Sequence, residues 1–198
     1  MQRSLFALVC LAAACSNTDN VVVGGVTAGE TTPQVLFDNI GSAIHGLAAM
    51  HDAGGNPLGP PQVVIILSDV PNLCARLTAK RDYFRNAPEA YEALILIIPS
   101  DNSCHPGDGI RLGTFFIGRT CDEGTSAEIV AAGGPQVTTP FHGLDSSYIA
   151  LTNWDPHGNA TGSFNILFDD PAGSATAHQF YGRYKTEPCT TLDGTLLP

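Results

Sequence analysis

The chain has 198 residues, of which 43% are hydrophobic and 14% are charged, so it is long enough for one domain with its own core and too apolar for a disordered protein. Its formal net charge is −10, and a surface of that sign repels phosphate backbones, which argues against binding to nucleic acid. The 21 glycine and 14 proline residues indicate many turns between short strands.

The N-terminal residues have the pattern of an export signal. One positive charge, Arg3, precedes an apolar run over residues 4–14, which is too short to cross a bilayer but has the length of a signal-peptide core. The run ends in Leu11-Ala12-Ala13-Ala14-Cys15, which resembles the bacterial lipobox. The resemblance implies a signal peptide over residues 1–14 and a lipid on Cys15, with an ordinary secretory signal cleaved after Ala14 as the alternative.

The next segments are a tether and a first element of uncertain type. Residues 15–33 are small and polar and predict a flexible tether, with a first strand at Val21–Val23, ahead of a domain over residues 34–198. Apolar residues between 34 and 51 lie near helical spacing, but Gly41 and Gly46 interrupt the pattern. We therefore expect a strand over 42–49 and keep a helix as the alternative.

Short elements follow at regular intervals. Two buried strands are expected at Val63–Leu67 and 93–98, with a short helix between them over Leu73–Arg85. Later strands are expected at 110–118, 126–132, 147–153, 163–168 and 178–185, the first two of these forming a hairpin across Cys121. About eight short strands and one short helix predict an all-β fold, a single β-sandwich domain.

A wider resemblance covers most of the mature chain. The order is an apolar strand ending in Leu67-Ser68-Asp69, then Cys74, a Gly-x-Phe strand (Gly162, Phe164), and a Gly-x-Tyr strand (Gly182, Tyr184) before Cys189. This order is similar to that of small predicted bacterial lipoproteins of unknown function. The resemblance implies a β-sandwich body and supplies no catalytic residues. Ser16 follows Cys15 in place of the Asp associated with retention at the inner membrane, so the lipobox resemblance implies the outer membrane.

Four cysteines remain once Cys10 leaves with the signal and Cys15 carries the lipid. An even number in an exported chain suggests two disulfides, and of the three pairings we favour Cys74–Cys189 with Cys104–Cys121. The second bond requires the flanks of the 110–118 strand to fold back toward each other. Cys104, His105 and Cys121 lack a close CxxC pair, so we expect no metal and no cofactor.

The sequence contains no GxSxG elbow, P-loop, HExxH helix or dinucleotide fingerprint, so we expect no enzymatic activity. Six scattered histidines leave an exported hydrolase as an alternative. Two other candidates concern binding. Asp101 and Asp108 lie in a glycine-rich turn that could hold calcium, although acidic residues in turns usually accept backbone hydrogen bonds. Trp154 is a candidate for stacking on a sugar, or for closing one end of the core.

A basic stripe lies on the expected helix. Its members are Arg76, Lys80, Arg81 and Arg85, which form two i,i+4 pairs if the helix is continuous. They are candidates for docking to anionic headgroups or to an acidic partner, and the alternative is a solvated face partly offset by Asp82. Together these features predict a non-enzymatic, lipid-anchored envelope protein, a structural or interaction module with an envelope protein or glycan as its partner. A sugar- or calcium-binding surface module is the alternative.

Overall fold

The computed structural model describes residues 20–23, 25–26, 35–36, 39–49, 59–101, 104, 106–107, 109–132, 141–168 and 178–193. Most of these residues are in strands, with one short α-helix, so the all-β prediction is confirmed. None of the helices in these ranges is long and apolar enough to cross a membrane.

The strands are β1 (Val21–Val23), β2 (Gly25–Val26), β3 (Val35–Leu36), β4 (Ser42–Ala48), β5 (Gln62–Ser68), β6 (Tyr91–Pro99), β7 (Gly113–Phe116), β8 (Ser126–Ala132), β9 (Phe141–His142), β10 (Tyr148–Asn153), β11 (Ala160–Phe168) and β12 (His178–Pro188). One ten-stranded sheet has the order β7-β10-β11-β12-β4-β5-β6-β8-β9, with β1 added to β12, while β2 and β3 pair with each other. The helical elements are α1 (Leu73–Ala79), η1 (Tyr83–Arg85), η2 (Thr120–Asp122) and η3 (Thr190–Leu192).

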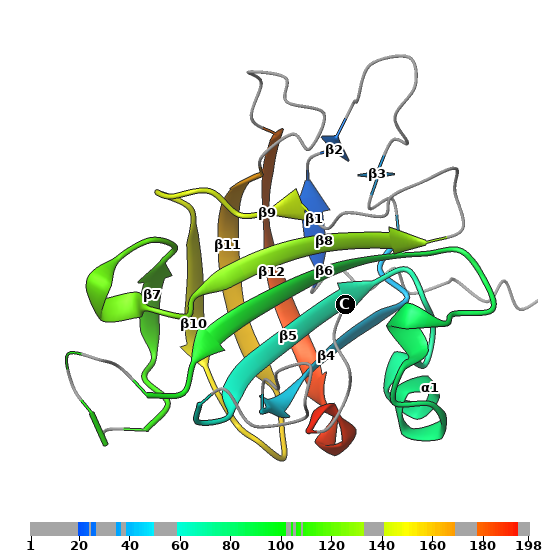
Figure 1. Cartoon of the computed structure of the whole chain (residues 1–198), viewed down its shortest axis with the longest axis horizontal. Coiled ribbons are helices and arrows are strands. Elements are labelled where there is room, and N and C mark those ends of the chain that lie inside the picture. Colours follow the sequence, from blue (N-terminus) through cyan, green and yellow to red (C-terminus); the bar gives the residue numbers. More distant parts are fainter. Residues whose placement is uncertain are drawn as a thin grey trace, which may run out of the picture.

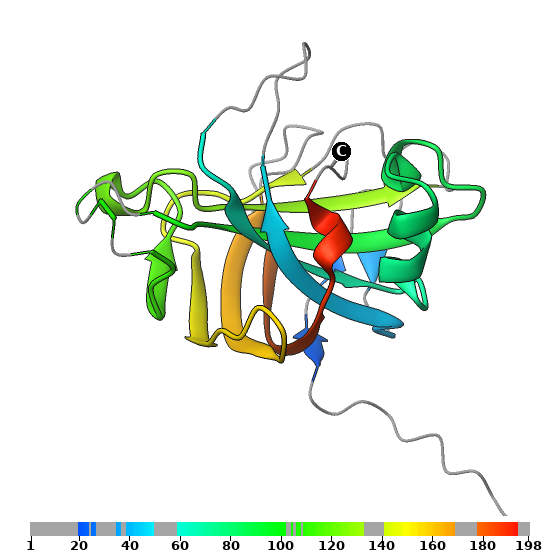
Figure 2. The same cartoon turned by 90° about the horizontal axis from the view of Figure 1, so that it is seen from below.

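The sheet bends so that its two halves face each other. In Figure 1, β4, β5, β6 and β8 form the front layer and cross β10, β11 and β12 behind them, and Figure 2 shows the same layers from below. The halves join where β12 runs parallel to β4, over the pairs Glu187↔Ile44 and Pro188↔His45. At the other end, Gly143 forms an isolated bridge to Phe168 in β11.

Two apolar cores explain the burial pattern. The main core lies between the layers and takes alternate residues of β11, such as Phe164 and Ile166, as a strand with one solvent face requires. The second core lies on the outer side of β4, β5 and β6, beneath Leu73 and Leu77 of α1. β5 and β6 are therefore buried on both faces, which explains why their sequences are unbroken apolar runs.

The two elements expected near the N-terminus are both strands, β1 and β4. The first strand over Val21–Val23 is confirmed, and it pairs antiparallel with β12, so the sheet includes part of the expected tether. Residues 42–48 form a strand rather than a helix, because β4 pairs with β5 along its whole length and contributes Ile44 and Ala48 to the second core. Tertiary pairing overrides the helical spacing there.

Two expectations about middle elements are wrong. The helix expected over Leu73–Arg85 ends at Ala79, because Lys80 adopts an extended conformation and the chain turns to bury Tyr83 and Phe84. The hairpin expected from 110–118 and 126–132 does not form. Instead β7 pairs with β10, while β8 pairs with β6 and β9, because the chain between them turns through a positive φ at Gly118 and through η2.

Both favoured disulfides are present. Cys74–Cys189 ties α1 to the chain just after β12, with the Cα atoms 5.6 Å apart, and Cys104–Cys121 has a Cα separation of 5.2 Å. The strand between Cys104 and Cys121 is shorter than expected, since β7 begins at Gly113 and ends at Phe116.

Candidate functional site

A row of side chains crosses the solvent-facing side of β7, β10, β11 and β12. Its members stand directly opposite one another in register: Phe116, Tyr148, Asn165 and Tyr181. Their strand neighbours Phe115, Ile149, Phe164 and Phe180 are buried in the main core, so alternation directs the row outward. Tyr181 is one of the most exposed large apolar side chains among the described residues, at 49%.

The row is flanked by hydrogen-bonding side chains. Asn165 lies between the two tyrosines, and its Oδ1 accepts a hydrogen bond over 2.8 Å from the Nε2 of Gln179, two residues before Tyr181 on β12. The Arg119 guanidinium lies over the Phe116 ring, 3.8 Å from its centre. The Phe116 ring also packs against the Tyr148 ring, with centres 6.2 Å apart.

A shallow groove of about 610 Å³ runs over this surface. We call it the Tyr148–Tyr181 face and define it by Tyr148, Ser163, Asn165, Gln179, Tyr181 and Arg183. These residues come from three adjacent strands that are fixed by continuous pairing, so the face is preformed. Rings beside amides and a guanidinium can pack on apolar surface and form hydrogen bonds at the same time.

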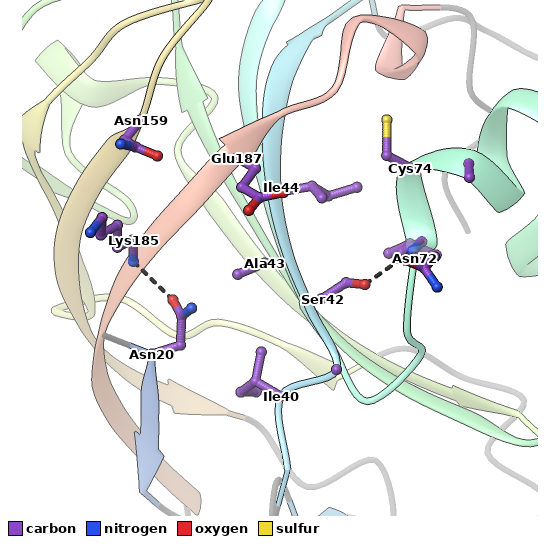
Figure 3. Close-up of a pocket in the computed structure, with 13 residues that line it drawn as sticks. Asn20, Ile40, Ser42, Ala43, Ile44, Asn72, Cys74, Asn159, Lys185 and Glu187 are labelled. Atoms are coloured by element: carbon purple, nitrogen blue, oxygen red, sulfur yellow. Dashed lines mark hydrogen bonds between the residues drawn. The ribbon is translucent and has the colours of Figure 1, made fainter. Parts of the chain in front are cut away.

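A second concave site lies between β4 and β12 (Figure 3). This groove, which we call the β4–β12 groove, has a volume of about 660 Å³. Its apolar lining includes Ile40, Ala43, Ile44 and Leu73, and its polar lining includes Asn20, Asn72, Asn159, Lys185 and Glu187. Asn20 is only 8% exposed, and its side-chain Oδ1 accepts a hydrogen bond from the Lys185 N–H over 2.8 Å.

Trp154, the candidate sugar-stacking residue, is half-buried and packs against the main core. Its ring lies edge-on to the ring of His45, with centres 4.9 Å apart. His45 Nε2 lies 3.1 Å from the Asp155 carbonyl oxygen, which can only accept, so Nε2 carries the proton. His45 Nδ1 then accepts from the Thr186 hydroxyl at 2.9 Å. These contacts are those of a ring that closes one end of the core.

Burial lowers the pKa of His45, because desolvation penalises the imidazolium more than its hydrogen-bond partners favour it. His45, in β4, is fully buried and is a neutral structural residue that packs against Trp154. The cavity beside them is small, about 200 Å³, and also contacts His157 and Asp193.

The candidate calcium ligands are described only in part. Asp101 Oδ1 accepts a hydrogen bond from the Gly107 N–H over 2.9 Å, which is the ordinary role of an acidic residue in a turn. Asp108 and Cys15 lie outside the described residues. Within the described ranges, no three His, Cys, Asp or Glu side chains lie close enough together to hold a metal ion.

The basic residues do not form one helical stripe, because α1 ends before Lys80. Arg76 forms an ion pair with Glu89, and its guanidinium lies 5.9 Å from the centre of the Tyr83 ring. Lys80 Nζ donates to the Asn86 carbonyl oxygen over 2.8 Å. Arg81 and Arg85 follow α1 and are exposed, Arg85 at the end of η1. Arg76 and Lys80 thus both interact with other residues of this same segment of the chain.

No protein-family model, no curated protein and no solved structure matches this chain. Its function is therefore inferred from its own side chains. Sequence reasoning missed the Tyr148–Tyr181 face, although the alternation of Phe180 and Tyr184 on one side of β12 already indicated that Tyr181 points to the other side. It also missed Asn20, which has no pattern to mark it.

Proposed function

We propose that this protein is a non-enzymatic envelope protein, held at the outer membrane by a lipid on Cys15, that binds glycan chains on the Tyr148–Tyr181 face. The observation that carries the proposal is the position of two tyrosines on either side of Asn165, whose amide is joined to that of Gln179. The sugar-binding alternative moves from Trp154 to this face, because the Trp154 ring is engaged by His45 and the core.

The chemistry of the face suits a saccharide. The C–H side of a sugar ring is apolar and packs on an aromatic ring, while its hydroxyl groups need donors and acceptors nearby. Amide groups and the Arg183 guanidinium supply both kinds of partner around Tyr148 and Tyr181. The two tyrosines are two strands apart, about 10 Å, so one extended chain of sugars can contact both rings. An open groove suits a polymer better than a small enclosed ligand.

The lining of the face supports binding rather than hydrolysis. Glycoside hydrolysis requires a pair of carboxyl groups beside the scissile bond. The residues that line the groove are Val21, Tyr148, Ser163, Phe164, Asn165, Gln179, Tyr181, Gly182 and Arg183, and none of these carries a carboxyl group. A sugar held there would be bound without an acid to protonate its glycosidic oxygen.

The anchoring part of the proposal rests on the N-terminal sequence and the disulfides. The apolar run before Cys15 resembles a lipoprotein signal, and two disulfides are typical of proteins outside the reducing cytosol. More than one acyl chain would hold the protein firmly at a bilayer. A module tethered in this way would contact the polysaccharides of the envelope, and nucleic acid is not among its expected partners because of the negative charge.

The proposal is tested by the retention of the detergent-solubilised full-length protein on a panel of immobilised envelope polysaccharides. We expect the wild type to bind at least one of them, and Tyr148→Ala and Tyr181→Ala to weaken that binding about tenfold each. Leu47→Ala is the matched control, because Leu47 is another exposed apolar side chain, at 38%, on β4. Failure of the wild type to bind any glycan, or equal binding by all four proteins, would exclude this function.

A further inference from the structure

The β4–β12 groove exists because two strands use the same edge of β12. β1 pairs with residues 181–183 of that edge, and β4 pairs with it only at Glu187 and Pro188. Between these segments the Asn20 side chain takes the place of a strand, since its Oδ1 accepts from the Lys185 N–H. Figure 3 shows Asn20 and Lys185 on one side of the groove and β4 with the start of α1 on the other.

The Asn20 amide has one group without a partner. Only the oxygen of the amide can accept from the Lys185 N–H, so the nitrogen must point away from β12. This Nδ2 is buried, and it has no hydrogen-bond partner among the residues that the structure describes. A buried donor without a partner is costly, and native proteins rarely leave one unless something else satisfies it. Its position in the lining of the groove makes a bound acceptor the natural partner.

The edge of β4 supplies a second donor. The Cys189 N–H donates to the His45 carbonyl oxygen over 2.7 Å, which sets the alternation of the parallel ladder. By that alternation, Ala43 and His45 direct their backbone groups toward β12. The register ends at the pair Ile44↔Glu187, so the Ala43 N–H lies just beyond the last pair. Ala43 and Asn20 both line the groove.

We propose that the β4–β12 groove binds an extended peptide segment, whose backbone carbonyl oxygens accept hydrogen bonds from the Asn20 side-chain amide and the Ala43 N–H. The segment would add to the edge of β4 as a short strand, a common way for sheets to bind peptides. Ile40 and Ala43, which are partly exposed, supply apolar surface for its side chains. This site is separate from the Tyr148–Tyr181 face and does not depend on glycan binding.

The test uses a tetra-alanine peptide, blocked by N-acetyl and C-terminal amide groups, titrated into the ¹⁵N-labelled full-length protein in detergent. We expect the Asn20 side-chain amide and Ala43 N–H resonances to shift, with a Kd of about 1 mM for so small a probe. Asn20→Asp keeps the oxygen that accepts from Lys185 but replaces the unpartnered donor by an acceptor. This substitution should weaken binding of the peptide about tenfold.

Gln179→Glu is the matched control, because it makes the same amide-to-acid change on the Tyr148–Tyr181 face. It should leave peptide binding unchanged, whereas Asn20→Asp should leave glycan binding unchanged. If Asn20→Asp does not fold, hydrogen exchange at the Ala43 N–H of the wild type decides the matter, since a bound peptide must slow it. Unshifted resonances, unaltered exchange, or equal binding by Asn20→Asp would overturn the proposal.

Discussion

Tyr148 and Tyr181 stand on opposite sides of Asn165 in one cross-strand row, on the first and third of three consecutive antiparallel strands. Asn165 pairs with Tyr148 on β10 and with Tyr181 on β12, so the two rings are separated by the width of two strand spacings, about 10 Å. A ligand must therefore be long enough to span that distance before it contacts both rings.

This spacing predicts that affinity depends on the length of the oligosaccharide. Binding should strengthen steeply at the length that first reaches both tyrosines and should change little beyond it. In Tyr181→Ala the step should disappear, because the second ring is gone. Calorimetric titration of a length series against both proteins measures this. A smooth increase with length in the wild type would mean that the rings do not act together.

The lipid anchor predicts the mass of the natively produced protein. We expect the mature chain to begin at Cys15 and to carry added acyl mass, and Cys15→Ser to lack that mass and to leave the membrane fraction. Intact-mass spectrometry of both forms provides the measurement. A wild-type chain that starts after Ala14 without added mass would replace the anchor by ordinary secretion.

The two disulfides should differ in what they contribute to stability. Cys74–Cys189 closes a loop with a sequence separation of 115, while Cys104–Cys121 closes one of 17. In the chain-entropy account, removing the disulfide that closes the longer loop lowers the free energy of unfolding by about 5 kcal/mol, and removing the other disulfide lowers it by about 3 kcal/mol.

Urea unfolding of the Cys74→Ala/Cys189→Ala and Cys104→Ala/Cys121→Ala proteins checks this order. The loss of the longer bond also leaves a gap at Cys189, which is buried in the second core beside Leu192, so its effect should be the larger for two reasons. A larger loss from the Cys104–Cys121 pair would contradict the prediction.

His45 should make stability depend on pH. Burial lowers the pKa of His45 below its ordinary value of 6.5, so the unfolded chain takes up this proton more readily than the folded protein. The contribution of neutral His45 to the free energy of unfolding is complete above the ordinary pKa of 6.5. It declines as the pH falls below that value and stops changing once the pH is below the pKa of His45 in the folded protein.

Urea midpoints measured between about pH 7.5 and pH 5 test this dependence. His45→Gln cannot titrate, so its midpoint should fall less over the same range, even though its stability at neutral pH is lower. Parallel curves for the two proteins would show that His45 is not the group responsible.

The sequence predicted where strands lie along the chain better than it predicted which strands pair with one another. Apolar runs such as Val63–Leu67 identified buried strands, because few other structures can bury every side chain in succession. The hairpin across Cys121 failed because sequential strands need not pair, and η2 with the Gly118 turn separates them. The helix after Leu73 was too long because burial of Tyr83 and Phe84 requires a turn that periodicity does not reveal.

The candidate sites were harder to predict for the same reason. Tyr148, Asn165 and Tyr181 each look like ordinary outward-facing strand residues, and only the register shows that they form a row. Asn20 lies in a polar segment that predicts a tether, and its burial depends on the pairing of β1 with β12. Both sites depend on which strands pair and in what register.

The most direct test of glycan binding is to map the chemical shifts of the ¹⁵N-labelled full-length protein as the best-retained oligosaccharide is added. We predict that the largest changes cluster at Tyr148, Asn165, Gln179, Tyr181 and Arg183, and that residues beside Trp154 and in the β4–β12 groove change little. Changes centred on Trp154 or spread over the surface, with the Tyr148–Tyr181 face unaffected, would contradict this account of the protein.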